Sequence, residues 1–305
     1  MSSVKTKTLN LLRKPLTFSW AEKTLLYFVR GTEYLGFWSR LIPGPQLYQK
    51  GSIRRVKRGG IDFELDISCL MQWYIYWDLS HVTRVNLYDL VKKGFVIFDV
   101  GTNVGETLLN FAELTGEGGF VYGFEPDEKN FRGVKKNIAL NNFSNVYVFN
   151  SGISDKKETL KLYRVDEHNL GMNRVLRDED ETGGLDFTEI ETTTLDDIVK
   201  ENGISQLDLI KIDIEGYEMH ALRGAGEILR RFRPILFIEV GYSRLIKNGT
   251  SPNEMIGFLE DFDYRIYHAE TLERITGDYD FSYLGDGGID VIARVESRSA
   301  SNEKQ

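Results

Sequence analysis

The segment from residue 96 to residue 105, VIFDVGTNVG, restricts the fold of this chain more than any other. Its first five residues are almost all apolar, which is typical of a strand covered on both faces of a parallel sheet. Gly101 and Gly105 follow, and glycines at the end of a strand let the backbone turn tightly and approach a ligand closely. A helical pattern begins at residue 106. The segment therefore predicts a strand, a ligand-binding loop and a helix in direct succession.

Strands and helices alternate over most of the chain. We expect helices at residues 85–93, 106–115, 128–141, 195–202, 218–231 and 252–261. We expect strands at residues 96–100, 119–124, 146–150, 189–193, 207–212, 235–240, 264–269 and 289–295. This alternation predicts an α/β fold, with a mostly parallel sheet and helices on both faces. The last two strands have no clear helix between them, so we expect them to pair antiparallel at one edge.

Basic residues are concentrated at the N-terminus. Residues 1–60 hold 12 Lys/Arg and 2 Asp/Glu, a net charge of +10, while the other 245 residues hold 26 and 44, a net charge of −18. Such an asymmetry indicates a basic arm with an anionic partner, which could be a membrane surface, an acidic glycan or the acidic body of the same protein. We do not expect nucleic acid, because the acidic body would repel phosphate. Residues 18–42 combine aromatic and basic side chains, and predict either a helical cap packed on the domain or an interfacial helix on anionic lipid.

The remaining features suggest four regions. Residues 1–45 would form the basic, partly helical arm, residues 46–83 a β-hairpin and an aromatic-rich lead-in, residues 84–297 the main domain, and residues 298–305 a disordered tail. The aromatic cluster at 73–77 is interpreted first as core and second as a surface that stacks on an acceptor.

The sequence also bears on the compartment. A single cysteine, Cys69, makes an intrachain disulfide impossible. No apolar run is long enough for a membrane span or a signal peptide. We therefore expect a cytoplasmic protein, with peripheral contact at the inner face of the membrane through the arm.

The loop after the first strand differs from a dinucleotide-binding loop. The dinucleotide fingerprint needs a second glycine where this chain has Asn103, and Glu106 at the start of the helix would repel a pyrophosphate. A ligand that carries an ammonium or sulfonium charge suits the loop better. The alternative is an ordinary glycine-rich turn.

Two further loops could complete a nucleoside site. Glu125 follows the second strand, 20 residues after Gly105, where a carboxylate can hold both ribose hydroxyls. The alternative is an acid that stabilises a helix start, although Pro126 and Asp127 already serve that turn. After the third strand, Gly152 would allow close approach of an adenine ring, and Ser154 or Asp155 could meet its amino group.

Acidic residues gather at the ends of two expected strands, 207–212 and 235–240. Asp213 and Glu215 follow the first of these, and Glu239 lies near the end of the second. A carboxylate in an apolar run is costly unless it is paired, which makes these residues site candidates. They could hold an ammonium group, act as a general base, or coordinate a divalent cation, with Asp213 and Glu239 as candidate ligands. The alternative is hydrogen bonding to nearby turn N–H groups.

The chain resembles the FkbM family of methyltransferases. The resemblance rests on DVGTNVG (99–105), GFEPDEKNF (123–131), N-x-A-L-N (137–141), TTLDDIV (193–199), LIKIDIEGYE (209–218), LRGA (222–225) and PILFIEVG (234–241). It implies a Rossmann-like class I methyltransferase fold with seven strands, of which the last is antiparallel. It also implies S-adenosylmethionine as the methyl donor, and usually a hydroxyl oxygen as the acceptor.

The resemblance carries roles over by position. Asp99, Gly101, Asn103 and Gly105 would cradle the methionine part of the donor, Glu125 would hold the ribose, and Gly152 and Ile153 would flank the adenine, with Thr102 and Pro126 beside them. Asp213 would lie beside the methyl group. Thr102 departs from the Ala that the family commonly has there.

For the acceptor's proton, the sequence offers several bases. Asp213 or Glu215 is expected to act, with His220, Lys211 and His168 as weaker candidates. The expected function is O-methylation of a sugar, glycolipid or natural-product hydroxyl, so the acceptor is a small molecule or a glycan. The alternatives are a nicotinamide-dependent oxidoreductase and a non-catalytic binding protein with the same fold.

Overall fold

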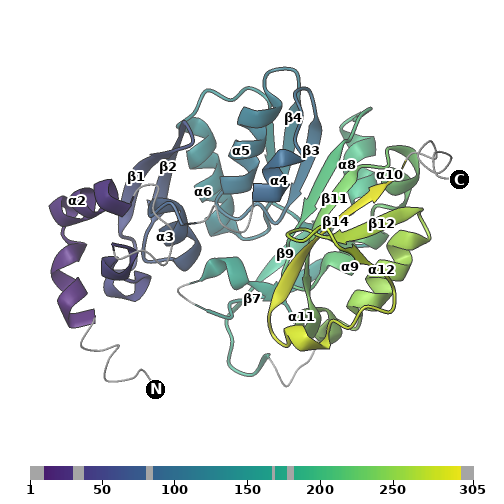
Figure 1. Ribbon diagram of the computed structural model, residues 1–305. Coiled ribbons are helices and arrows are strands. Elements are labelled where there is room, and N and C mark those ends of the chain that lie inside the picture. The colour runs from purple at the N-terminus through teal and green to yellow at the C-terminus, as the bar shows by residue number, and fades with distance from the viewer. Residues whose placement is uncertain (1–9, 30–37, 80–84, 167–168, 177–181, 297–305) are drawn as a thin grey trace, which may run out of the picture.

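The computed structural model of the protein describes residues 10–29, 38–79, 85–166, 169–176 and 182–296. Its centre is an eight-stranded sheet in the order β13-β12-β14-β11-β10-β3-β4-β5 (Figure 1). The strands are β3 (Val96–Val100), β4 (Phe120–Phe124), β5 (Val146–Phe149), β10 (Leu209–Ile212), β11 (Ile235–Gly241), β12 (Tyr264–His268), β13 (Arg274–Ile275) and β14 (Gly288–Val295). Strands β11, β10, β3, β4 and β5 pair in parallel. The predicted α/β class and mostly parallel sheet are confirmed.

The antiparallel strand lies one position further inside the sheet than expected. β14 pairs antiparallel with β12, as predicted, but also with β11, so it separates these two strands. Its side chains explain this place, because Val291 and Ala293 are buried in the core on one face and Ile292 in the core on the other. A strand that is apolar on both faces is stable inside a sheet. The two-residue strand β13 then forms the edge and raises the strand count from seven to eight.

Helices cover both faces of the sheet (Figure 1). Adjacent residues of β3 point to opposite sides, so that Phe98 packs in one core cluster and Ile97 in another. The cluster around Phe98 includes residues of α8 (Leu195–Glu201), α9 (Glu218–Arg223), α10 (Gly226–Arg231) and α12 (Pro252–Glu260). The cluster around Ile97 includes residues of α4 (Val85–Asp89), α5 (Glu106–Thr115) and α6 (Glu128–Ala139). The result is a three-layer sandwich.

The predicted helix over 218–231 is wrong, because the chain forms two helices there, α9 and α10. The break falls at Gly224, where an added Cβ atom would lie 2.1 Å from the carbonyl oxygen of Ser154. This close approach to a neighbouring loop requires glycine, and glycine also weakens a helix. The structure adds a short helix that the sequence did not predict, α11 (Tyr242–Lys247).

The predicted strand at 189–193 exists but does not belong to the main sheet. It is part of β9 (Phe187–Thr193), in a separate four-stranded sheet with the order β6-β9-β7-β8. Its partners are β6 (Gly152–Ile153), β7 (Thr159–Tyr163) and β8 (Arg174–Val175). This small sheet lies beyond the carboxyl end of β5, where it can wall one side of a ligand site.

A second core joins the N-terminal elements to the main domain. The predicted hairpin is present as β1 (Ile53–Arg58) and β2 (Ile61–Asp66), followed by α3 (Leu70–Tyr76), and α2 (Ser19–Val29) packs beside them. The aromatic cluster is core, as the first interpretation held, because Trp73, Tyr76 and Trp77 are buried.

None of the helices in the described ranges is both long and apolar enough to cross a lipid bilayer.

Two asparagines of the N-x-A-L-N motif fix this second core to α6. Asn137 Oδ1 accepts a hydrogen bond from the backbone N–H of Glu64 at 2.7 Å, and Asn141 Oδ1 accepts one from the N–H of Asp62 at 3.0 Å. Asn137 Nδ2 also donates to the carbonyl oxygen of Val104 at 2.9 Å. The motif therefore satisfies the open edge of β2 and holds the loop after β3 in place.

Candidate active site

A cleft lies at the carboxyl ends of β3, β4 and β10. Its empty volume is about 1120 Å³, a value that includes space open to solvent. Gly101, Glu125 and Asp213 line the cleft, each from the loop after a different strand. Opposite the sheet, the cleft is lined by Met71 and Ile75 of α3 and by residues of the small sheet. The carboxyl edge of an open parallel sheet is where such folds bind ligands.

The loop after β3 turns through glycines in a conformation that other residues rarely adopt. Gly101 has a φ of +83° and Gly105, the N-cap of α5, has a φ of +90°. An added Cβ atom at Gly101 would lie 1.9 Å from the backbone carbonyl oxygen of Asp213. The two loops are thus in backbone contact, which only a residue without a side chain allows.

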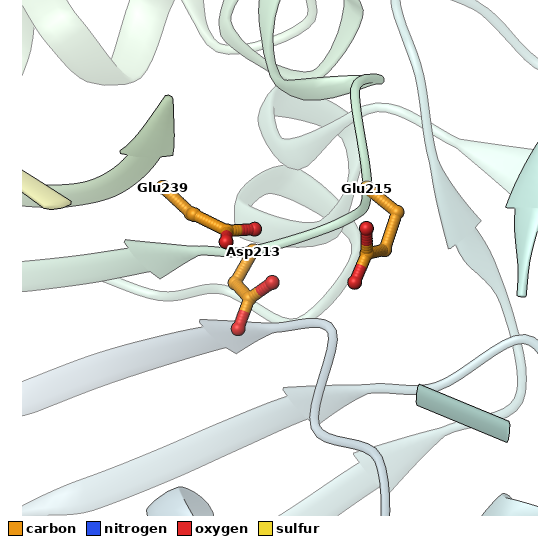
Figure 2. Close-up of side chains that lie close together, drawn as sticks. All are labelled: Asp213, Glu215 and Glu239. Carbon is orange, nitrogen blue, oxygen red and sulfur yellow. The ribbon is translucent and has the colours of Figure 1, made fainter. Parts of the chain in front are cut away.

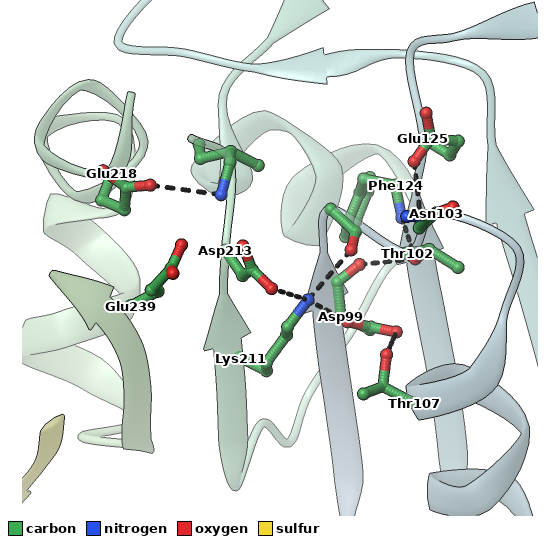
Figure 3. A network of polar contacts seen from close by, with 12 residues as sticks. Asp99, Thr102, Asn103, Thr107, Phe124, Glu125, Lys211, Asp213, Glu218 and Glu239 are labelled. Carbon is green, nitrogen blue, oxygen red and sulfur yellow. Dashed lines mark hydrogen bonds and ion pairs between the residues drawn. The ribbon is translucent and has the colours of Figure 1, made fainter. Parts of the chain in front are cut away.

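Glu125 is a buried carboxylate at the end of β4 (Figure 3). Its Oε2 accepts a hydrogen bond from the N–H of Asn103 at 2.7 Å, and its Oε1 accepts one from the N–H of Asp127 at 3.1 Å. Asn130 Nδ2 donates to Oε1 at 3.4 Å. Burial raises the pKa of Glu125 to about 8, and these hydrogen bonds oppose the rise. A carboxylate has about four lone-pair sites, so both oxygens can accept a further hydrogen bond from a ligand.

Lys211 of β10 links this strand to β3 and to the loop after it. Its Nζ lies 3.4 Å from Oδ1 of Asp99 and 3.4 Å from Oδ2 of Asp213, and it donates to the carbonyl oxygen of Gly101 at 2.9 Å (Figure 3). Asp99 Oδ2 accepts a hydrogen bond from Thr107 Oγ1 at 2.6 Å. The buried ammonium therefore offsets the charges of two carboxylates and fixes the glycine turn.

Thr102 orders the same loop from its other side. Its hydroxyl donates to the carbonyl oxygen of Asp99 at 2.8 Å and accepts from the N–H of Phe124 at 3.1 Å. Both groups are buried, so the hydroxyl satisfies a donor and an acceptor that water does not reach. An alanine at this position could make neither bond.

Three acids from two strand ends converge beside the cleft (Figure 2). One carboxylate oxygen from each of Asp213, Glu215 and Glu239 lies within 4.8 Å of the other two. Burial is the largest cause that raises the pKa of Glu215, to about 7, and the charge of Asp213 adds to it. Burial and the charge of Asp213 likewise raise the pKa of Glu239.

Arg244 of α11 neutralises part of this acidic cluster. Its Nη2 lies 2.9 Å from Oε1 of Glu239, and its Nη1 lies 3.3 Å from Oε2 of Glu215. With Lys211 beside Asp213, each of the three acids has a cationic partner from the protein. The arrangement therefore does not fit the divalent cation that the sequence suggested, because a metal ion would have to displace the guanidinium.

Glu218 stabilises the loop after β10. Its Oε1 accepts hydrogen bonds from the N–H groups of Ile214 and Gly216, at 3.2 and 2.9 Å. Burial raises its pKa to about 7. These bonds fix a turn in which Glu215 has a φ of +56° and Gly216 a φ of +102°. The turn directs the Glu215 side chain toward the cleft that it lines.

The other predicted site residues differ in whether they line the cleft. Pro126, Gly152 and Ile153 line the cleft, as do Thr102 and Asn103. His220 is buried on α9, where it stacks on Tyr217 and lies 3.7 Å from a carboxylate oxygen of Asp155, and it is not among the residues that line the cleft. His168 lies outside the described residues.

Several residues of the site were not predicted. Arg244 could have been expected, since the cost of an unpaired strand-end carboxylate requires a cation near Glu239. The segment that includes Asn169, Asn173 and Arg174 also lines the cleft. Which of its residues reach the cleft could not be predicted, because the position of the segment depends on how the small sheet folds back over the main one.

The sequence pattern of the Methyltransferase FkbM domain matches residues 99–266, which is more than half of the chain. The chain belongs to the FkbM methyltransferase family. The match begins at Asp99 in β3 and ends at Ile266 in β12. It covers both strand ends that carry the acidic cluster and every residue that lines the cleft except Met71 and Ile75 of α3.

Three methyltransferases of known name are among the proteins similar in sequence to this chain. It is 25% identical over 189 residues to methyltransferase sdnD of Sordaria araneosa, covering 53% of this chain and 71% of the relative. It is 29% identical over 163 residues to 31-O-demethyl-FK506 methyltransferase FkbM of Streptomyces tacrolimicus, covering 44% and 60%. It is 26% identical over 170 residues to 2-O-methyltransferase NoeI of Sinorhizobium fredii, covering 50% and 65%. The chain thus spans less than two thirds of the last two relatives.

Among solved structures, an FkbM methyltransferase from Methylobacillus flagellatus KT aligns over 94% of this chain and 58% of its own length. The sequence identity is 17% and the TM-score 0.40. Fibrillarin from Aeropyrum pernix, solved with S-adenosyl-L-methionine, aligns over 81% and 84%, with 13% identity and a TM-score of 0.41.

Proposed function

We propose that this chain transfers a methyl group from S-adenosylmethionine to a hydroxyl oxygen of a small-molecule or glycan acceptor. The observation that carries the proposal is the meeting of Gly101, Glu125 and Asp213 in one cleft, each after a different strand of the sheet. The names of two relatives, a 31-O-demethyl-FK506 methyltransferase and a 2-O-methyltransferase, support an oxygen as the methyl acceptor.

The residues of the cleft fit this donor. The backbone of Gly101 lies against that of Asp213, which holds the glycine loop beside the acidic loop, and Glu125 keeps acceptor sites for two ribose hydroxyls. Asp213 and Glu215 place negative charge where a sulfonium and an ammonium group would be stabilised. Glu106, at the start of α5, also lines the cleft and disfavours the pyrophosphate of a nicotinamide dinucleotide.

Glu215 is the base that we propose for the acceptor hydroxyl. It lines the cleft, two residues after Asp213 in the chain. Burial raises its pKa to about 7, and a base with such a pKa can both accept and release a proton near neutral pH. When bound, the donor supplies an electrophilic methyl carbon. Glu215 takes the hydroxyl proton onto a carboxylate oxygen, and the walls of the cleft hold the acceptor oxygen in line with that carbon.

The part of the cleft that is lined by residues 169–175 supports an acceptor with several polar groups. Oδ1 of Asn169, Oδ1 of Asn173 and Nε of Arg174 are buried and make no hydrogen bond within the described part of the chain. Buried polar atoms are normally satisfied, so ligand groups are the expected partners. The nearby side chains of Met71 and Met172 are apolar and would cover a carbon skeleton. Two acceptors and one donor beside such surfaces suit a sugar or a polyhydroxylated natural product.

Calorimetry distinguishes this proposal from its alternatives. We expect S-adenosylmethionine and S-adenosylhomocysteine to bind and NAD to give no heat of binding. Binding of NAD alone would support an oxidoreductase, and binding of none of the three would support a non-catalytic protein. Transfer of a labelled methyl group to a hydroxyl, measured on a panel of glycans and polyhydroxylated small molecules, then tests the acceptor class.

A further inference from the structure

The α2 helix has one buried and one exposed face. Ala21, Leu25 and Val29 are buried, and the last two pack into the core cluster of the hairpin and α3. On the opposite face, Trp20 is 73% exposed and Tyr27 is 80% exposed. Large aromatic side chains rarely remain this exposed on a helix that is already anchored, so the outer face of α2 is a candidate binding surface.

The exposed aromatic side chains continue beyond the helix. Phe28 stacks on Trp38 with ring centroids 4.7 Å apart, and Tyr27 meets the edge of Phe28 at 5.5 Å. The chain before α2 adds exposed apolar side chains, namely Leu11, Leu12 and Phe18. We call this set, together with Trp20, the aromatic face. It lies at the end of the molecule that is remote from the C-terminal strands (Figure 1).

The described segments that carry and follow the aromatic face are basic. Residues 10–29 and 38–60 contain nine Lys/Arg and one acid, Glu22, although Arg55, Lys57 and Arg58 pair with Glu64, Asp62 and Asp78. Glu22 is buried and pairs with Arg54 at 2.8 Å, so it adds no negative charge to the surface. Lys14, Lys23 and Arg40 are exposed, and Lys23 is on the same side of α2 as Trp20 and Tyr27.

We propose that the aromatic face docks on the surface of an anionic lipid membrane. Aromatic rings are favoured at the boundary between headgroups and acyl chains, and lysine and arginine beside them attract anionic headgroups. A second copy of the chain is a poorer partner, because two basic faces would repel each other. The acidic remainder of the protein, with a net charge of −18, would be repelled from the same membrane, so the protein would bind with α2 toward the lipid.

This inference does not depend on the proposed function, since its test needs no methyl transfer. The full chain is sedimented with vesicles of phosphatidylcholine alone and with vesicles that also contain phosphatidylglycerol. We expect binding only to the anionic vesicles, with a decrease at high salt. The double variant Trp20→Ala/Tyr27→Ala should lose most of this binding, and Lys14→Gln/Lys23→Gln should weaken the partition coefficient by roughly fivefold for each lysine.

Tyr283→Ala is the matched control, because Tyr283 is 62% exposed in a different part of the molecule. It should leave vesicle binding unchanged, and circular dichroism checks that each variant is folded. Equal sedimentation with both kinds of vesicle, or no sedimentation with either, would overturn the proposal. So would a wild-type dimer in analytical ultracentrifugation that Trp20→Ala/Tyr27→Ala dissociates, because the aromatic face would then be a contact between copies.

Discussion

The backbone of Gly101 lies so close to Asp213 that an added Cβ atom would be 1.9 Å from the carbonyl oxygen of Asp213. The donor loop of β3 and the acidic loop of β10 therefore have one fixed relative position. Residues 110 positions apart in the chain, such as Gly101 and Lys211, are also joined there by a hydrogen bond of 2.9 Å. The contact makes the geometry of the site sensitive to a single methyl group.

We expect Gly101→Ala to abolish donor binding and to lower the free energy of unfolding. The matched control is Gly60→Ala, because Gly60 also has a positive φ, +91°, but no atom within 4 Å of an added Cβ. Gly60→Ala should cost about 1 kcal/mol from backbone strain alone, and Gly101→Ala about 1–3 kcal/mol more from the clash. Urea denaturation and calorimetry measure both effects. Equal stability and donor affinity in the two variants would contradict the close contact.

Glu125→Gln tests the carboxylate that is assigned to the ribose. Because the pKa of Glu125 is raised to about 8 in the folded chain, the folded state holds a proton that the unfolded state loses near its ordinary value. This group therefore stabilises the fold less as the pH rises from about 4.5 to about 8. We expect the free energy of unfolding to fall less steeply over this window in Glu125→Gln than in the wild type.

The same variant should also remove a pH dependence of donor binding. An ionised Glu125 accepts hydroxyl hydrogen bonds better than a protonated one, so wild-type affinity should rise between pH 6 and pH 9, roughly, as Glu125 ionises. Glu125→Gln should bind the donor roughly tenfold or more weakly, without that rise. Titration of the donor's own groups would appear in both proteins, so an identical rise in the variant would exclude Glu125 as the cause.

pH–rate profiles can distinguish whether Glu215 or Asp213 is the base. If Glu215 is the base, kcat should rise with pH through about 7, and Glu215→Gln should lose this limb together with about 10²–10⁴-fold in rate. Asp213→Asn removes a charge that raises the pKa of Glu215, so the limb should remain and move to lower pH. Donor binding should stay measurable in both variants. A limb that persists in Glu215→Gln and vanishes in Asp213→Asn would assign the base to Asp213.

Arg244→Met tests the conclusion that the guanidinium takes the place of a metal ion. Loss of Arg244 leaves the partly buried Glu215 and Glu239 without their cation, which should destabilise the fold by about 1–3 kcal/mol. We expect wild-type activity to be unchanged by a chelator or by added Mg²⁺, measured after dialysis. Calorimetry should detect no Mg²⁺ binding by the wild type, and any heat of Mg²⁺ binding should appear only in Arg244→Met. A wild-type enzyme that is inactive without added metal would show that the guanidinium moves aside.

Local patterns in the sequence were enough for the elements near the donor loop. The strand at 96–100 and the helix at 106–115 were predicted at the bounds that the structure has, because apolar runs and a glycine turn act within a few residues. The break of the predicted helix at 218–231 was missed, since it depends on how closely Gly224 approaches Ser154 from another loop. The inner position of β14 was missed for a similar reason, because it depends on both edges of this strand finding partners, β11 and β12, from other parts of the chain.

The sequence by itself determined the chemistry of the site residues and the order in which strands present them. Asp99 is the last residue but one of β3, and Glu125 and Asp213 directly follow β4 and β10, because an apolar run ends at each place and turn residues come after it. Only the tertiary structure decided the partners: Lys211 between Asp99 and Asp213, and Arg244 between Glu215 and Glu239. Burial and neighbouring charge set whether a carboxylate is a base, a ligand or half of an ion pair, and both arise only when distant segments fold together.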